Sequence, residues 1–183
     1  MAFMDNSLAF QPSTPSWSTA QSFTSTATGT HIVDVIGAGV GTIPAMVNTF
    51  PSSAYQKIGF DIGAGDGVAI PYLYVAFTSV GTSANTITVA LWAAPDSGSG
   101  GTEGSYTLLY QSPALVESAL AAGDVLLVPV PPIQVTEGEA LPRFYKVVYT
   151  CSNTVAVSVL AGLMINPPNL GLPGQYPNRF LAV

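Results

Sequence analysis

The chain has 183 residues, which is enough for one domain with a well-buried core, alone or with extended arms. Charged residues make up only 8% of it, against about 25% in an ordinary soluble domain, while hydrophobic residues make up 48%. A soluble monomer needs charge on its surface to stay dispersed. We therefore expect another molecule to cover much of this surface.

Neither a membrane nor a nucleic acid is the expected cover. The best apolar runs, residues 125–130 and 155–165, fall well short of the roughly 20 residues that a helix needs to cross a bilayer. A transmembrane β-barrel is a less favoured alternative. Residues 1–17 have neither the basic segment nor the apolar segment of a secretion signal. The net charge is −6, and the basic residues are few and scattered: Lys57, Arg143, Lys146 and Arg179. These exclusions leave protein as the cover.

In chain order, the sequence divides into three zones. Residues 1–28 form a Ser/Thr-rich N-terminal arm, residues 29–165 hold the periodic segments of a folded domain, and residues 166–183 form a Pro-rich C-terminal arm. The four prolines of the last zone exclude both a helix and a central strand there. We therefore expect one domain with an extended arm at each end.

The middle zone has the pattern of β-strands almost throughout. Residues 86–92 (TITVALW) alternate strictly, with Ile87, Val89 and Leu91 on one face. The expected strands cover residues 31–36, 55–62, 72–80, 86–92, 106–111, 125–130, 143–150 and 155–165. One short helix is expected over residues 113–122 (PALVESALAA), before a Gly-Asp turn. About eight short strands with so little helix predict an all-β, jelly-roll-like sandwich.

Residues that carry catalysis or hold metals are scarce. His31 is the sole histidine and Cys151 the sole cysteine, too few for a zinc cluster, and His31 is expected to be a polar residue at a strand start. The glycine-rich residues 63–67 suggest a calcium loop only weakly, and a tight turn is the favoured interpretation. Glu137 and Glu139 lie two apart in a loop, which favours a solvated turn over a glycosidase pair. We expect no enzyme, cofactor or metal.

Both arms carry large apolar side chains, which disordered tails normally lack. One interpretation is that the arms pack back on their own sandwich, and the other is that at least one arm lies on a neighbouring subunit. The second interpretation predicts interface anchors, with one arginine as a pairing charge: Phe3, Phe10, Trp17, Tyr176, Arg179 and Phe180. Arg143 is expected instead to act inside the subunit, beside acidic loop residues.

Several short segments resemble one known family. They are residues 4–10 (MDNSLAF), residues 31–35 (HIVDV) after a Ser/Thr/Ala-rich stretch, residues 86–92, and residues 138–149 (GEALPRFYKVVY). In these segments the chain resembles the capsid cement (decoration) proteins of tailed phages, of the type found in Bordetella phage. The chain departs from that pattern in its glycine-rich loop over residues 96–104 and in its long proline tail.

The resemblance implies a jelly-roll sandwich that forms a homodimer or homotrimer on the outer surface of a virion. Such a protein would bind the major capsid protein and cement adjacent capsid subunits. The alternative is a lectin-like sandwich of a phage or cell surface, which would bind glycans through exposed aromatic residues such as Trp92, Tyr72 and Tyr74. A hydrolase built on a jelly roll is a third and least favoured class.

Overall fold

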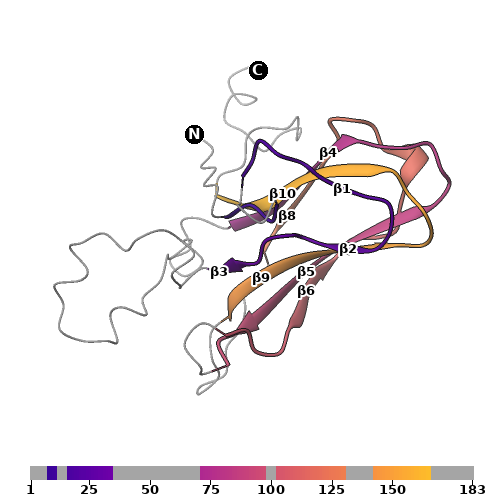
Figure 1. The fold of residues 1–183 in the computed structure, drawn as a ribbon. Helices are drawn as coiled ribbons and strands as arrows, with labels where there is room; N and C mark the ends of the chain where they lie inside the picture. Colours follow the sequence, from indigo (N-terminus) through magenta and orange to yellow (C-terminus); the bar gives the residue numbers. More distant parts are fainter. Residues whose placement is uncertain (1–7, 12–15, 35–70, 98–101, 131–141, 166–183) are drawn as a thin grey trace, which may run out of the picture.

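A computed structural model describes residues 8–11, 16–34, 71–97, 102–130 and 142–165 of the chain. The described residues form two antiparallel β-sheets that pack face to face, so the predicted all-β sandwich is confirmed (Figure 1). Within these ranges no helix is long and apolar enough to span a membrane.

The two sheets share the strands unequally. Sheet A has the order β1-β10-β4-β8, and its strands are β1 (Gln21–Phe23), β4 (Pro71–Ser79), β8 (Val125–Pro129) and β10 (Val157–Ile165). Sheet B has the order β2-β9-β5-β6, built from β2 (Ala27–Thr28), β5 (Thr86–Pro95), β6 (Thr107–Gln111) and β9 (Pro142–Cys151). Two short strands join it, because β3 (Val33–Asp34) pairs with β9 and β7 (Leu115–Val116) pairs with β5.

The strand pairs are nested along the chain. The first strand pairs with the last, β2 pairs with β9, β4 pairs with β8, and β5 pairs with β6. Such nesting means that one long antiparallel ribbon has wrapped over itself. Most connections pass from one sheet to the other, while β5, β6 and β7 follow one another within sheet B. This is the connectivity of a jelly roll.

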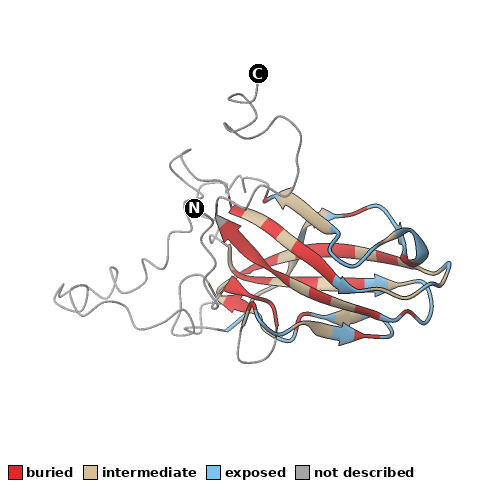
Figure 2. Ribbon diagram, turned by 90° about the horizontal axis from the view of Figure 1, so that it is seen from above, coloured by how far each residue is buried: buried red, intermediate tan, exposed pale blue. Residues whose placement is uncertain are grey.

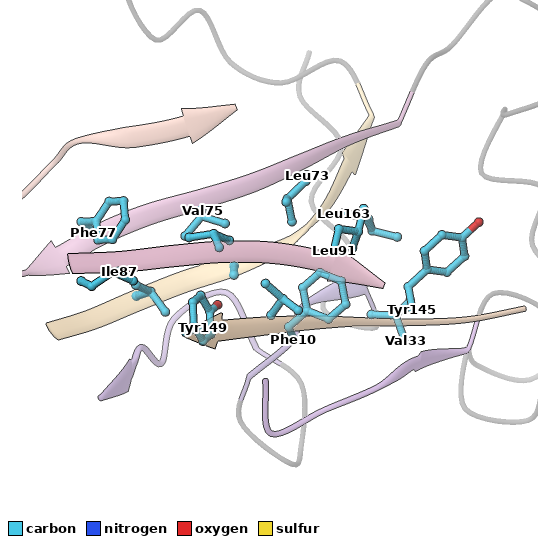
Figure 3. Packing of buried hydrophobic residues seen from close by; sticks show 14 of the residues in the cluster. Phe10, Val33, Leu73, Val75, Phe77, Ile87, Leu91, Tyr145, Tyr149 and Leu163 are labelled. Atoms are coloured by element: carbon cyan, nitrogen blue, oxygen red, sulfur yellow. The ribbon is translucent and has the colours of Figure 1, made fainter. Parts of the chain in front are cut away.

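The core lies between the sheets and follows from the period-2 pattern of the strands. Ile87, Val89 and Leu91 of β5 are fully buried in one cluster with Val75 and Val159 of sheet A. Figure 2 shows buried positions alternating along the strands, and Figure 3 shows Ile87, Leu91 and Val75 in the core. Because successive side chains of a strand point to opposite faces, each long strand supplies the core with every second residue.

The structure confirms several strands and corrects two predictions. The strands expected over residues 72–80, 86–92, 106–111, 125–130, 143–150 and 155–165 are all present, and only part of residues 31–36 and none of 55–62 lies within the described ranges. The predicted helix over residues 113–122 is wrong. Its residues form β7 and a single 3-10 turn, η4 (Glu117–Ala119), because the backbone of Leu115 and Val116 pairs with β5.

The second correction concerns the N-terminal arm. Residues 21–28 form β1 and β2, which pair with β10 and β9. The boundary at residue 28 therefore does not separate an arm from the sandwich. These strands are two and three residues long and rich in Gln, Ser, Ala and Thr, so they lack the alternation that reveals a longer strand.

Candidate interaction surface

The predicted anchor Phe10 belongs to the core of its own chain. Ala9 forms an antiparallel bridge with Gly162, and the Phe10 amide donates to the Ala161 carbonyl at 2.8 Å. The side chains of Leu8 and Phe10 are 1% and 0% exposed, and Phe10 lies among the core residues between the sheets (Figure 3). In this arrangement Phe10 has no surface left for a neighbouring subunit, so its prediction as an interface anchor is corrected.

Trp17 also packs on its own chain, but on the outer side of sheet A. Its ring meets Tyr74 edge to face, with centroids 5.8 Å apart, and it covers Met164 and Ala9. Gly162 lies beneath the ring, where any added Cβ would overlap it. Trp17 keeps 9% of its surface exposed, so it contributes the edge of a surface rather than a free anchor.

Phe3, Tyr176, Arg179 and Phe180 lie outside the described residues. Their role as interface anchors stays a prediction. Of the two expected anchors that the structure describes, Phe10 lies in the core and Trp17 lies on the outer side of sheet A, so these two do not share one surface.

The outer face of sheet A is apolar. Because Leu73, Val75, Leu126, Val128, Val159 and Ala161 pack against the core, their neighbours in each strand point outward. Tyr74 of β4 lies between Leu127 of β8 and Gly162 of β10, and Ala76 lies between Val125 and Leu160. The face is made by these residues together with one flanking row: Tyr72, Tyr74, Ala76, Val125, Leu127, Leu160, Gly162 and Met164.

Charge is distributed unequally between the sheets. The four strands of sheet A contain no Asp, Glu, Lys or Arg, whereas the strands of sheet B contain Asp34, Arg143 and Lys146. An antiparallel sheet with one solvated face normally alternates apolar residues inward with polar residues outward. The outer face of sheet A departs from that rule, and among the described strands it is the natural candidate for contact with protein.

The outer face of sheet B is different in character. Trp92 of β5 lies between Lys146 of β9 and Leu108 of β6. The Lys146 ammonium lies 3.6 Å from the centroid of the Tyr106 ring, and the Tyr106 hydroxyl donates to Glu103 at 2.7 Å. Trp92 is thus on the opposite side of the sandwich from Tyr72 and Tyr74, and the three aromatics cannot form a single strip for a glycan.

Arg143 acts within the chain, as expected. Its guanidinium forms a two-point ion pair with Asp34, at 2.8 and 2.9 Å, and a further ion pair with Asp96. The hydrogen bond to Asp34 is the largest cause that raises the pKa of Arg143 above its ordinary value. The cluster ties β3 to β9 and to the loop after β5, so it holds one end of sheet B together.

Glu117 is a buried carboxylate that the sequence reasoning missed. Its side chain is 1% exposed and accepts hydrogen bonds from the backbone amides of Gly81 (3.1 Å), Ser83 (3.3 Å) and Ala156 (2.6 Å) and from the Ser83 hydroxyl. The Ser83 hydroxyl is the largest cause that lowers the pKa of Glu117, and burial acts against it. The carboxylate joins the β4–β5 loop, η4 and the β9–β10 loop.

Within the described ranges, no three His, Cys, Asp or Glu side chains gather closely enough to hold a metal. Burial raises the pKa of the half-buried Cys151 thiol, with a smaller contribution from the charge of Glu117, and a raised pKa keeps a thiol unreactive. The Asp and Glu residues described above serve ion pairs or turns.

No protein-family model matches the chain, and no curated protein matches it significantly. The described residues define a class, a β-sandwich with jelly-roll strand pairing and one uncharged outer face.

Proposed function

We propose that this chain is a structural virion protein that binds the outer surface of a phage capsid as a homo-oligomer and cements adjacent major capsid subunits. One observation carries the proposal: the chain has 8% charged residues, and the strands of its sheet A have none. A large apolar surface of this kind marks a site of contact with another molecule. The resemblance of residues 4–10, 31–35, 86–92 and 138–149 to tailed-phage cement proteins supplies the kind of partner.

The mechanism that follows is clamping by several contacts at once. One oligomer that engages several capsid subunits converts each later contact into an intramolecular event, so modest contacts combine into firm attachment. The proposed anchors on the capsid are Phe3 in the N-terminal arm and Tyr176 and Phe180 in the C-terminal arm, with Arg179 as the pairing charge. The buried Phe10 acts by fixing the position of Leu8, to which residues 1–7 are attached.

The test is co-sedimentation of the purified protein with empty capsids of its phage. We expect wild-type protein to pellet with capsids and to raise the temperature at which the shells come apart. Deleting residues 1–7 spares Leu8, Phe10 and Trp17, which belong to the fold, so a loss of binding would report on the arm alone. Wild-type protein that stays in the supernatant at micromolar concentration would refute the proposal.

Point variants separate anchoring from folding. Phe3→Ala and Phe180→Ala are expected to weaken capsid binding about tenfold or more without lowering the unfolding temperature. Phe10→Ala is the matched control, because it removes a core side chain and lowers the free energy of unfolding by about 3–5 kcal/mol. If Phe3→Ala and Phe180→Ala both bind capsids like wild type, the anchors are misassigned.

A lectin-like module is the second candidate function. The observation that favours it is the outer face of sheet B, where Trp92, Lys146 and Tyr106 gather beside Leu108. Aromatic rings beside charged groups are suited to stacking on sugars. Binding of the isolated protein to a glycan panel, abolished by Trp92→Ala and unaffected by Tyr74→Ala, would favour this function over capsid cementing.

A further inference from the structure

We infer that the free edge of β8 is a docking site for an extended segment of a different protein chain, which adds to sheet A as a further strand. In the order β1-β10-β4-β8, β8 pairs with β4 on one side, and among the described strands none pairs with its other side. Under the proposed function this segment belongs to a capsid subunit, and the choice of partner rests on that function.

The backbone of β8 points alternately toward β4 and away from it. The Val130 amide donates to the Pro71 carbonyl at 2.8 Å, so Val130 points toward β4. Because successive residues of an antiparallel strand point their amides and carbonyls in opposite directions, Pro129, Leu127 and Val125 point theirs away from β4. Val125 and Leu127 therefore each present an N–H and a C=O on the free edge, whereas Pro129 presents only a C=O.

Among the described edges, β8 has the least protection against strand addition. Natural sheets protect their edges with very short strands, charged side chains, prolines or bulges. The strands β1, β2, β3 and β7 have two or three residues each, and a register shift interrupts the pairing of β6 with β5. β8 keeps a regular register with β4 over five residues and has no charged side chain. Its one protective residue is Pro129, which lies at its end.

The side chains of β8 define the chemistry of the added segment. Leu126 and Val128 pack against the core but remain partly exposed, so the side chains added beside them must be apolar. Val125 and Leu127 lie on the uncharged outer face of sheet A and are also partly exposed. The segment that fits is therefore extended, uncharged, about five residues long and rich in β-branched side chains.

A second copy of β8 fits this edge poorly. Twofold pairing about Leu127 or Val128 places the Pro129 ring where a carbonyl of the other copy needs an N–H donor. Twofold pairing about Leu126 places the exposed Asp124 carboxylate beside Val128 of the other copy, at the margin of the core. A different chain is free of both constraints, and strand addition to a sheet edge is a recurring mode of peptide recognition.

The experiment uses proline to remove an outward N–H while the hydrogen bonds to β4 stay in place. Leu127→Pro should keep the circular dichroism of wild type, because Pro129 already occupies an outward position of the same strand. In co-sedimentation with empty capsids, Leu127→Pro should raise the dissociation constant at least about 30-fold, because a carbonyl of the added strand loses its donor. Leu127→Val is the matched control: it keeps the N–H, and it should bind within about fivefold of wild type.

Two further proline variants keep the test independent of a folding defect. Val125→Pro removes the other outward N–H and should weaken capsid binding in the same way. Leu126→Pro removes an N–H that points toward β4, so it should lower the unfolding temperature where the two outward variants do not. Folded Leu127→Pro and Val125→Pro proteins that bind like wild type would overturn the inference, as would a Leu127→Val variant as weak as Leu127→Pro.

Peptide binding separates this inference from the proposed function. If wild type and Leu127→Pro bind capsids equally well, cementing stands and the docking edge is refuted. If wild type does not bind capsids, cementing is refuted, and a displayed library of random peptides tests the edge. Enrichment of uncharged, β-branched peptides on wild type but not on Leu127→Pro keeps the inference, whereas no enrichment, or equal enrichment on both, overturns it. A wild-type dimer in light scattering that Leu127→Pro dissociates assigns the edge to a second copy and also overturns the inference.

Discussion

Glu117 is the residue whose replacement gives the sharpest prediction. The variant Glu117→Gln keeps the shape of the side chain but replaces one acceptor oxygen by an amide that donates. The four donors that Glu117 now serves come from Gly81, Ser83 and Ala156. The Ser83 hydroxyl can rotate to accept from the new amide, whereas at least one backbone N–H loses its acceptor and the charge that strengthened the others is gone.

The magnitude follows from these hydrogen bonds. A hydrogen bond to a charged group contributes about 1.5–3 kcal/mol, and an orphaned buried donor costs about 1–3 kcal/mol. We therefore expect Glu117→Gln to lower the free energy of unfolding by about 3 kcal/mol at pH 7. For a chain of 183 residues, this corresponds to a fall in Tm of roughly 6–12 °C.

The pH dependence has a definite sign. The pKa of Glu117 is lower in the folded protein than the ordinary value of about 4.3 for an unfolded chain. The carboxylate therefore contributes its full stability above about pH 4.3, and that contribution is lost as the pH falls through the folded pKa. We expect the stability difference between wild type and Glu117→Gln to be largest at neutral pH and to shrink in acid.

The assay is urea unfolding followed by circular dichroism at pH 7, 5, 4 and 3. Glu103→Gln is the matched control, because Glu103 accepts one hydrogen bond from Tyr106 at the surface, and its replacement should change stability by less than about 1 kcal/mol. A Glu117→Gln variant whose free energy of unfolding lies within about 0.5 kcal/mol of wild type at pH 7 would contradict a stabilising role for these hydrogen bonds. So would a stability difference that stays constant down to pH 3.

Other substitutions test the packing of the N-terminal segment and of sheet B. Gly162→Ala adds a Cβ within 2.6 Å of the Leu8 carbonyl and into the Trp17 ring, so thermal unfolding should show a loss of about 2–3 kcal/mol and tryptophan fluorescence should shift to the red. Trp17→Ala uncovers Met164 and should cost about 3 kcal/mol in urea unfolding. Arg143→Lys cannot keep the two-point ion pair with Asp34, and a loss of about 1–2 kcal/mol is expected, with an unchanged stability telling against the pair.

The long strands were predictable because their signal is local. The alternation of β5 and β10, with every second residue apolar, already separates an inward from an outward face before any partner is known. The same pattern placed Tyr72 and Tyr74 on the face opposite Leu73. Nothing in the sequence alone indicates that these tyrosines and Trp92 lie on opposite sides of the sandwich, since that depends on which sheet each strand joins.

Segments whose structure depends on distant partners were not predictable. Residues 113–122 have the composition of a helix, but Glu117 binds amides 34 to 39 residues away in the chain, and β7 pairs with β5. Phe10 was expected to be an anchor because it is a large apolar residue in a polar arm. Its carbonyl accepts from His31, and its amide donates to Ala161, which lies in the last strand.

The sequence by itself determined the fold class, the approximate strands and the shortage of charged residues. Only the tertiary structure decided that Phe10 lies in the core and that the buried Glu117 carboxylate joins separate loops by hydrogen bonds. It also decided that the uncharged strands lie together in sheet A. The physical reason is that periodicity depends on neighbours in the chain, whereas burial and hydrogen-bond partners depend on contacts between residues far apart in it.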